Sequence, residues 1–247
     1  MNQKETAFVY TLSSRDNMVQ QCLRSIATLK HYVNEEQIKI FYTPPYNEQD
    51  EKALKDTGAK LLKKENQTEA FNVSRSLPER HYGEKVNLCA LEEENIVFLD
   101  CDTVVGKDIW DVMEGDFDFK ARPSKIFAQE NKEWENLFKE NDEVYMDWMP
   151  NAGFMIFKNG FHREIEGKWR RYITNDPDFS LGKVNHNEQY ALALAVSGGD
   201  VKMMEEKEHV FEWKGEKVAD AYVYHVQQAA GSSAVNLMKN YLKKLKP

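Results

Sequence analysis

The chain of 247 residues has little cysteine and no long apolar run, and both shortages restrict what it can be. Its three cysteines, Cys22, Cys89 and Cys101, are scattered and lack the spacing of a metal site. This pattern is typical of a reduced intracellular protein, not of a disulfide framework. No apolar run approaches the roughly 18 residues of a membrane span, and the start, MNQKETAFVY, has no signal-peptide core. We therefore expect a cytoplasmic protein.

The chain also lacks an excess of positive charge, since its 33 basic residues are outnumbered by 41 acidic ones and the formal net charge is -8 at pH 7. Non-specific binding to nucleic acid needs basic surface that releases counterions from the phosphates. We therefore expect no nucleic-acid partner. Aromatic residues are plentiful, and no long segment has low complexity. The chain is predicted to be globular throughout.

Apolar runs alternate with helical patterns along the first part of the chain. The patterns predict strands at 7–14, 37–43, 59–64 and 95–99, and helices at 17–32, 48–58 and 84–94. Alternation of this kind indicates an α/β fold with a mainly parallel sheet covered by helices on both faces. In such sheets, ligands bind beyond the carboxyl ends of the strands.

The alternation is looser after residue 105. The patterns predict strands at 116–123, 152–158 and 220–226, and helices at 131–140, 162–173, 187–197 and 233–246. Residues 65–82 are polar and irregular, which predicts a loop. No internal repeat and no convincing linker is present, so we expect a single domain.

One stretch, NIVFLDCDTVV at 95–105, has an unusual order of residues. Apolar residues run directly into two acids, and ionised groups beside a core are costly unless they are paired or bound to metal. On a strand, Asp100 and Asp102 would point to the same side, about 7 Å apart. Oxygen ligands without a cluster of cysteines or histidines suit Mg²⁺ or Mn²⁺ carrying phosphate oxygens. The alternative is a pair of solvated acids that cap the next helix.

Five segments in this order resemble the GT-A fold glycosyltransferases that use nucleotide sugars, especially the retaining family 8 group with glycogenin and the bacterial galactosyltransferases. They are FVYTLSSRDNMVQQCLRSIATL (8–29), KVNLCALEEENIVFLDCDTVV (85–105), PNAGFMIF (150–157), NEQYALALA (187–195) and AYVYHV (221–226). The resemblance implies a Rossmann-like, mixed and mainly parallel sheet flanked by helices in one domain. It implies a nucleotide-binding half at about 1–105, a donor-sugar and acceptor half at about 106–233, and a C-terminal amphipathic helix at 234–247.

The resemblance also implies roles for individual residues. Asp100 would meet the ribose and the metal, while Asp102 and His225 would be direct metal ligands, and Lys85 would face the sugar or base side of the donor. The remaining nucleotide and donor contacts would come from Thr11, Leu12, Ser14, Cys101, Asn151, Ala152 and Gly153. Glu188 and Gln189 would lie near the anomeric carbon and acceptor, and together with Asp100 and Asp102 they form the expected catalytic set.

Each of these residues also has an ordinary structural explanation. A histidine in an aromatic strand is commonly a core residue, and Lys85 can be the solvated end of a helix. Residues 151–153 can be a turn in which Gly153 supplies a positive φ. Glu188 can be a first-turn charge that the helix dipole favours.

The implied function is metal-dependent transfer of a sugar from a nucleotide-diphosphate donor, with UDP favoured, to a hydroxyl of a glycan, a lipid-linked or a protein acceptor. Mn²⁺ or Mg²⁺ would be the cofactor. We expect retention of configuration; with inversion, Glu188 would be the base. One alternative is a phosphatase of haloacid-dehalogenase type with Asp100 as nucleophile. Another is a catalytically weak nucleotide-sugar binding protein. A sugar-nucleotide pyrophosphorylase lacks support, because no Gly-rich basic N-terminal loop is present.

The chain departs from the family pattern in two places. The family follows its histidine with a lysine that touches the donor phosphates, but here VQQAAGSS follows His225 and Gly231 occupies the lysine position. Lys239 or another base would have to replace it. Met18 occupies the position of an aromatic residue that often stacks on the base.

Two further sets of residues allow two interpretations each. The C-terminal helix has an apolar stripe and many lysines, so it would dock on the domain or attach weakly to an anionic membrane, which suits a lipid-linked acceptor. A second set would form part of the core or line an acceptor cleft, because sugars stack on aromatic faces. It comprises Trp134, Phe138, Tyr145, Trp148 and Met149.

Overall fold

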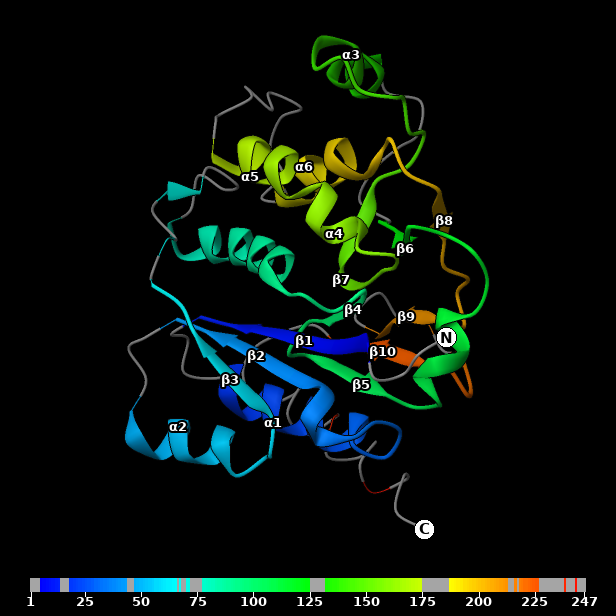
Figure 1. Ribbon diagram of the computed structural model, residues 1–247. Helices are drawn as coiled ribbons and strands as arrows, with labels where there is room; N and C mark the ends of the chain where they lie inside the picture. Colours follow the sequence, from blue (N-terminus) through cyan, green and yellow to red (C-terminus); the bar gives the residue numbers. More distant parts are fainter. Residues whose placement is uncertain are drawn as a thin grey trace.

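The computed structural model describes residues 5–13, 18–43, 47–65, 67, 70–71, 77–124, 132–174, 187–212, 216, 218–226, 238 and 243. Within them, a seven-stranded sheet runs through the centre of the molecule (Figure 1). In order across the sheet, its strands are β3 (Lys60–Lys63), β2 (Ile38–Tyr42), β1 (Thr6–Leu12), β4 (Asn95–Leu99), β7 (Pro150–Phe157), β6 (Phe119–Pro123) and β8 (Val201–Met203).

The sheet is mixed and mainly parallel. Strands β3, β2, β1 and β4 run parallel to one another, and β6 and β8 are also a parallel pair. Strand β7 runs antiparallel to both of its neighbours, β4 and β6. The start of β7 therefore lies beside the end of β4. The predicted fold class, a single-domain α/β fold with a mainly parallel sheet flanked by helices, is confirmed.

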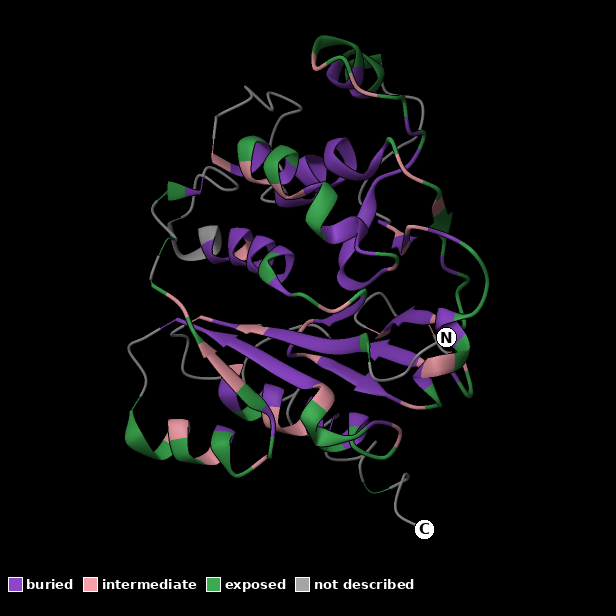
Figure 2. Cartoon of the chain, viewed as in Figure 1, coloured by how far each residue is buried: buried purple, intermediate pink, exposed green. Residues whose placement is uncertain are grey.

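Side chains of the central strands alternate between two cores, as a period of two requires. Phe8 and Tyr10 of β1 pack into the core beneath α1 (Met18–Leu29) and α2 (Glu48–Lys55), whereas Ala7 and Val9 pack into the core on the other face. That second face carries the 3-10 helix η4 (Leu77–Ala90), α4 (Phe161–Glu164), α5 (Glu166–Thr174) and α6 (Asn187–Val196). Figure 2 shows the sheet buried between these layers.

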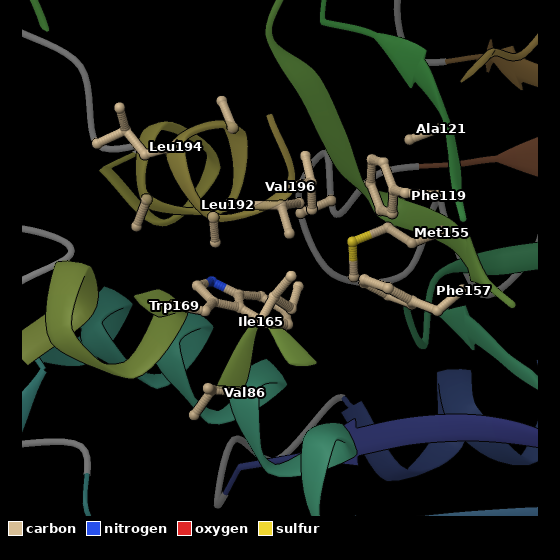
Figure 3. Packing of buried hydrophobic residues seen from close by; sticks show 14 of the residues in the cluster. Val86, Phe119, Ala121, Met155, Phe157, Ile165, Trp169, Leu192, Leu194 and Val196 are labelled. Carbon is tan, nitrogen blue, oxygen red and sulfur yellow. The ribbon is translucent and has the colours of Figure 1, made fainter. Parts of the chain in front are cut away.

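The larger core joins helices to strands that are far apart in the sequence. In Figure 3, Val86 of η4, Trp169 of α5 and Leu192 of α6 gather around Phe157 of β7 and Phe119 of β6. The rings of Phe119 and Phe157 lie 4.9 Å apart, and Trp169 stacks on Phe157 at 6.2 Å. This packing fixes α6 over the sheet, and with it the position of the two polar residues in the first turn of α6.

A small second sheet of the described region consists of β5 (Thr103–Val105), β10 (Val223–His225) and β9 (His209–Phe211). Strand β10 is antiparallel to β5 and parallel to β9, with His225 opposite Thr103. Strand β5 begins directly after Asp102. The second sheet thus brings the late histidine to the end of β4.

Most of the predicted elements are present, and some differ. The helix predicted at 84–94 is the longer 3-10 helix η4, and the helix predicted at 162–173 is divided into α4 and α5 at Ile165. The short strands β5, β8 and β9 and the 3-10 helices η2 (Glu35–Gln37) and η5 (Ile109–Met113) were not predicted. None of the described helices is long and apolar enough to cross a bilayer.

The C-terminal helix predicted at 233–246 lies outside the described residues, except for two positions. Met238 is buried in a cluster with Val104, Val210 and Tyr224 of the second sheet, while Lys243 is exposed. Both placements agree with a segment that docks on the domain.

The aromatic set that allowed two interpretations is mostly core. Trp134 of α3 (Lys132–Glu140), Phe138, Trp148 and Met149 are buried, while Tyr145 is 46% exposed. Trp134 packs edge-on against Phe138 at 4.9 Å, and its indole nitrogen donates a hydrogen bond to the Met146 carbonyl oxygen at 2.7 Å. This leaves Tyr145 as the member of the set that can meet a ligand from solvent.

The core assignment predicts a large stability cost for Trp134→Ala. We expect the free energy of unfolding to fall by about 3–5 kcal/mol, because the substitution leaves a cavity and an unpaired carbonyl. Tyr145→Ala is the matched control and should cost under about 1 kcal/mol. Urea unfolding followed by circular dichroism measures both. Equal midpoints for Trp134→Ala and the unmodified protein would show that Trp134 is not a core residue.

Candidate functional site

The two acids of the 95–105 segment lie on a turn, not on an extended strand as predicted. Strand β4 ends at Leu99, and the Thr103 backbone N–H donates to the Asp100 carbonyl oxygen at 3.2 Å. The Thr103 hydroxyl donates to the same oxygen at 2.8 Å. A turn brings the carboxylates closer than the pleat of a strand would. The expected convergence of Asp100 and Asp102 is therefore present, with a different local cause.

A buried polar network anchors this turn to the first strand and helix. The Tyr10 hydroxyl lies 2.9 Å from the Ser25 hydroxyl, which lies 3.1 Å from the Thr103 hydroxyl. Thr28 accepts a hydrogen bond from the Val105 backbone N–H at 3.0 Å. Side chains of β1 and α1 thus hold both ends of β5, and the turn before β5 has little freedom.

Asp100, Asp102 and His225 form a group of potential metal ligands, with one ligand atom from each lying within 4.8 Å of the others. The His225 Nε2 atom is 3.3 Å from Asp102 Oδ1 and 3.9 Å from Asp100 Oδ2. Ligands of Mg²⁺ at about 2.1 Å lie about 3 Å apart when adjacent and about 4.2 Å apart when opposite. Two carboxylates and one imidazole at these separations could hold a divalent cation.

The charges within this group depend on one another. Burial alone would raise the pKa of the Asp102 carboxyl, but the charge of His225 and its hydrogen bond outweigh burial and lower this pKa. Burial opposes protonation of His225, and the Asp102 carboxylate outweighs it and raises the pKa of the imidazole. Without a cation, the proton of His225 therefore balances one of the two partly buried carboxylates.

Lys85 is not the solvated helix end of the ordinary interpretation, since it is 4% exposed. Its Nζ atom lies 2.9 Å from Asp100 Oδ1 and 3.2 Å from Oδ2, and it donates to the Ala152 carbonyl oxygen at 2.9 Å. The ammonium group also lies 5.2 Å from the centre of the Phe98 ring. Lys85 thus joins η4, the Asp100 carboxylate and the start of β7.

The start of β7 completes this side of the site. The Asp100 backbone N–H donates to the Gly153 carbonyl oxygen at 2.8 Å, and the Gly153 N–H donates to Asn151 Oδ1 at 3.0 Å. A Cβ atom on Gly153 would lie 2.3 Å from His225 Cε1 and 2.7 Å from Nδ1. The interpretation of Gly153 as a turn residue with positive φ is wrong, because it lies in a strand. Glycine here makes room for the imidazole.

Glu188 and Gln189 begin α6 and point buried polar atoms at the same region. Glu188 is 4% exposed, and its Oε1 atom accepts a hydrogen bond from Gln189 Nε2 at 3.4 Å. Among the described residues, Glu188 Oε2 and Gln189 Oε1 have no hydrogen-bond partner. Burial raises the pKa of Glu188 to about 7, with Lys85 opposing the rise and Asp100 adding to it. Two orphaned acceptor atoms in this position suit a bound ligand.

Of the residues expected to line the nucleotide, Thr11 and Leu12 end β1, and Cys101 follows β4. Thr11 is partly buried, while the Leu12 and Cys101 side chains are buried in the core. Cys101 Sγ donates to the Thr11 carbonyl oxygen at 3.4 Å, and a hydrogen bond to Cys22, burial and the neighbouring acids raise the pKa of the Cys101 thiol. Leu12 and Cys101 therefore have only backbone groups to offer a ligand.

Three of the predicted positions cannot be placed, because Ser14, Gly231 and Lys239 lie outside the described residues. Met18, expected where the family often has an aromatic residue, begins α1 and is partly buried. Its sulfur accepts a hydrogen bond from the Ser13 hydroxyl at 3.6 Å. It thus lies at the carboxyl end of β1, beside the region expected to line the nucleotide.

His209, a residue that the sequence analysis missed, lies directly behind the group. Its ring is parallel to the His225 ring within 10°, with centroids 5.4 Å apart. His209 Nε2 and His225 Nδ1 are 3.3 Å apart. In the sequence, the signal that could have marked His209 was its position in a short apolar run. The sequence did not pair it with His225, because β9 and β10 are each three residues long.

The fold and the position of the group define a class of α/β proteins that bind ligands beyond the carboxyl ends of parallel strands. No protein-family model matches the chain, and no curated protein matches its sequence. Solved structures do match. The galactosyltransferase LgtC, in complex with donor and acceptor sugar analogs, has a TM-score of 0.63 at 12% identity, over 98% of this chain and 96% of that chain.

Two further structures support the comparison. The glycosyltransferase GlyE of Streptococcus pneumoniae has a TM-score of 0.60 at 14% identity, over 98% of this chain and 61% of that chain. Mouse xyloside xylosyltransferase 1 has a TM-score of 0.53 at 10% identity, over 89% of this chain and 96% of that chain. The chain therefore has the GT-A fold of the glycosyltransferases, and the predicted resemblance is confirmed at the level of the fold. The phosphatase alternative receives no support.

The close approach of His225 to Gly153 predicts that Gly153→Ala lowers stability. We expect a loss of about 1–3 kcal/mol in the free energy of unfolding, because the imidazole must move away from the new methyl group. We also expect weaker binding of Mn²⁺. Urea unfolding and isothermal titration calorimetry measure the two effects.

Gly167→Ala is the matched control for this variant, since nothing lies within 4 Å of a Cβ atom at Gly167. On helix α5, it should raise stability by up to about 1 kcal/mol. Equal effects of the two alanines would contradict the steric role of Gly153.

The burial of Glu188 predicts that Glu188→Gln becomes more stable than the unmodified protein as pH rises. Below pH 4.5 the Glu188 carboxyl is neutral in the folded and in the unfolded protein. Between pH 4.5 and 7 the folded protein keeps a proton that the unfolded protein releases. Glu188 therefore lowers the free energy of unfolding progressively as pH rises through this range. At about 1.4 kcal/mol per pH unit, the variant should be about 3 kcal/mol more stable than the unmodified protein at pH 8, and equal to it at pH 4.

Chemical unfolding in chelator at several pH values tests this expectation. Glu114→Gln, at an exposed position, is the control and should show no such trend. A stability difference for Glu188→Gln that does not change with pH would mean that Glu188 is ionised in the fold.

Proposed function

We propose that this protein is a metal-dependent glycosyltransferase that moves a sugar from a nucleotide-diphosphate donor, a UDP-sugar in the first instance, to an acceptor hydroxyl. The observation that carries the proposal is the Asp100, Asp102 and His225 group at the carboxyl end of β4 in a chain of GT-A fold. Ligand positions in this class of sheet lie at that edge. The LgtC structure is a complex with donor and acceptor sugar analogs, which supports the same classes of ligand here.

In this proposal Asp100, Asp102 and His225 hold Mn²⁺ or Mg²⁺. When bound, such an ion acts as a Lewis acid on the oxygens of the departing diphosphate. Lys85 holds the Asp100 carboxylate in place through both carboxylate oxygens. Asp100 would also contact the donor ribose. Thr11, Leu12 and Cys101 would contribute backbone groups to the nucleotide site.

The donor sugar would lie between the start of β7 and the start of α6. Asn151, Ala152 and Gly153 would line one side, and the orphaned oxygens of Glu188 and Gln189 would accept hydrogen bonds from sugar hydroxyls. Near neutral pH, Glu188 exists in both protonation states because burial raises its pKa to about 7. A carboxyl of this kind can accept a hydrogen bond from, or donate one to, an oxygen near the anomeric carbon.

Retention of configuration is our proposal for the stereochemical outcome. The donor diphosphate would take the acceptor proton, so that few protein groups are needed as acid or base. If the product is inverted, Glu188 is the base, since its pKa suits proton abstraction near neutral pH. Proton NMR of the fresh product distinguishes the two anomers.

The proposal also covers the acceptor class and the location of the protein. We propose a glycan, a lipid-linked or a protein acceptor, and a cytoplasmic protein. Peripheral contact with an anionic membrane through the lysines of the C-terminal segment stays a prediction, and Lys243 is exposed as that contact requires.

The proposal predicts stabilisation by one nucleotide sugar that depends on both Mn²⁺ and Asp102. In a thermal-shift screen of UDP-, GDP-, ADP- and CMP-sugars, a ligand at one hundred times its Kd adds about 2.7 kcal/mol. For a chain of this length, that raises Tm by about 5–10 °C. Asp102→Asn should abolish the shift. Asp116→Asn, an exposed acid outside the group, is the control and should retain it.

Three outcomes separate the alternatives. A shift that does not depend on metal counts against the assignment. A phosphorylated Asp100, or robust phosphatase activity, indicates the phosphatase. Metal-dependent donor binding with neither donor hydrolysis nor transfer to a broad panel of acceptors indicates a binding protein.

A further inference from the structure

A second buried histidine stands behind the proposed cation site and has no role in the function proposed above. His209 is 0% exposed, and its Nε2 atom lies 3.3 Å from His225 Nδ1. The other ring nitrogen of His225, Nε2, faces Asp102 and Asp100. The His225 imidazole therefore lies between two carboxylates on one side and a second imidazole on the other.

The surroundings of His209 are those of an aromatic core residue. The Phe154 ring lies edge-on at 5.5 Å, and the Phe211 ring lies at 4.8 Å. Burial lowers the pKa of His209 well below its ordinary value, and within the described residues its Nδ1 atom has no hydrogen-bond partner. A buried polar atom without a partner costs stability. Phenylalanine would fill this space without that cost, so stability alone does not account for a histidine.

The cation site places a demand on His225 that His209 meets. For Nε2 to bind a cation, it must be unprotonated, so the ring proton must lie on Nδ1. Metal-bound histidines almost always donate this second N–H to an acceptor, which fixes the tautomer and the ring orientation. Within the described residues, the atom within hydrogen-bond distance of His225 Nδ1 is His209 Nε2, at 3.3 Å, and it can accept that N–H when it is itself unprotonated.

His209 is itself held in place along its strand. The Arg122 guanidinium donates to the His209 carbonyl oxygen, and it pairs with both Glu216 carboxylate oxygens at 2.6 and 3.0 Å. Glu216 also accepts a hydrogen bond from the Phe211 backbone N–H at 2.8 Å. On its other side β9 pairs with β10. These contacts keep the His209 ring against His225.

We propose that His209 is a positioning residue for the cation site: when the cation is bound, its Nε2 accepts a hydrogen bond from His225 Nδ1 and so holds the tautomer and ring orientation in which His225 Nε2 faces the cation beside Asp100 and Asp102. This inference rests on the proposed function only through the cation site. It concerns the binding of the metal alone and does not depend on a particular donor or acceptor.

The test is the affinity for Mn²⁺ alone, measured by isothermal titration calorimetry on the full chain. His209→Phe keeps an aromatic ring in this place but removes the nitrogen that accepts the hydrogen bond from His225. We expect this variant to bind Mn²⁺ about 10- to 100-fold more weakly. The same variant should keep or raise Tm, since it removes an unpaired polar atom from an aromatic pocket. His209→Gln retains a side-chain acceptor of similar reach and should recover most of the affinity.

His162→Phe is the matched control. His162 is also fully buried, lies edge-on to Phe157 at 6.5 Å, and bonds through Nε2 to the Leu91 carbonyl oxygen. Its substitution should leave the Mn²⁺ affinity unchanged, whatever it does to Tm. Unchanged affinity in His209→Phe, or a loss that follows Tm across all three variants, would overturn the inference.

A measurement on the unmodified protein covers the case in which a variant does not fold. Long-range ¹H–¹⁵N spectra of the Mg²⁺-loaded protein should show the His225 proton on Nδ1 and the His209 proton on its own Nδ1. A proton on His209 Nε2 in the loaded protein would overturn the inference.

If Asp102→Asn loses Mn²⁺ and His209→Phe does not, the inference fails and the proposed function stands. If Mn²⁺ binds as expected and no nucleotide sugar does, the proposed function fails and the inference stands. If the unmodified protein binds no Mn²⁺, both fail.

Discussion

The structure depends on the neutralisation of two carboxylates at the end of a buried strand. Asp100 and Asp102 follow β4, whose residues are all buried. Carboxylates in such a position destabilise a fold unless opposite charge meets them. Lys85 meets Asp100, and the imidazole of His225 meets Asp102. These partners come from η4 and β10, so one electrostatic requirement ties together segments that lie far apart in the chain.

The same requirement explains how the site could hold a divalent cation. Without one, the Lys85 ammonium and the His225 proton balance the two acids. A cation held by Asp100, Asp102 and His225 would supply the positive charge that the His225 proton supplies otherwise. Lys85 would keep its contacts with Asp100 and the Ala152 carbonyl oxygen. Gly153 allows this arrangement, because any larger residue would fill the space of the imidazole.

The comparison with LgtC shows how much sequence change the fold tolerates. The two chains share 12% identity over 98% of this one. What is common to such chains is the order of strands and the alternation of buried side chains, which many apolar residues can satisfy. The polar positions at the carboxyl edge have fewer solutions, since each must meet a particular neighbour. The resemblance was recognised from five ordered segments, and two of them, NIVFLDCDTVV and PNAGFMIF, contain polar residues at this edge.

Local patterns in the sequence indicated most of the strands and helices and marked Asp100 and Asp102 as candidates, because periodicity and misplaced charge are properties of short segments. The resemblance to a known family added His225. Strand β4 covers the predicted range, Asn95–Leu99. Tertiary structure decided the rest: the turn that joins the two acids, the burial of Lys85, the contact of Gly153 with His225, and the presence of His209. Each depends on which distant segments pack together, and strands of three residues such as β5, β9 and β10 carry too little pattern to reveal their partners. An apolar run that ends in acids is visible in the sequence, whereas the burial of a lysine and a hydrogen bond between two rings require the fold.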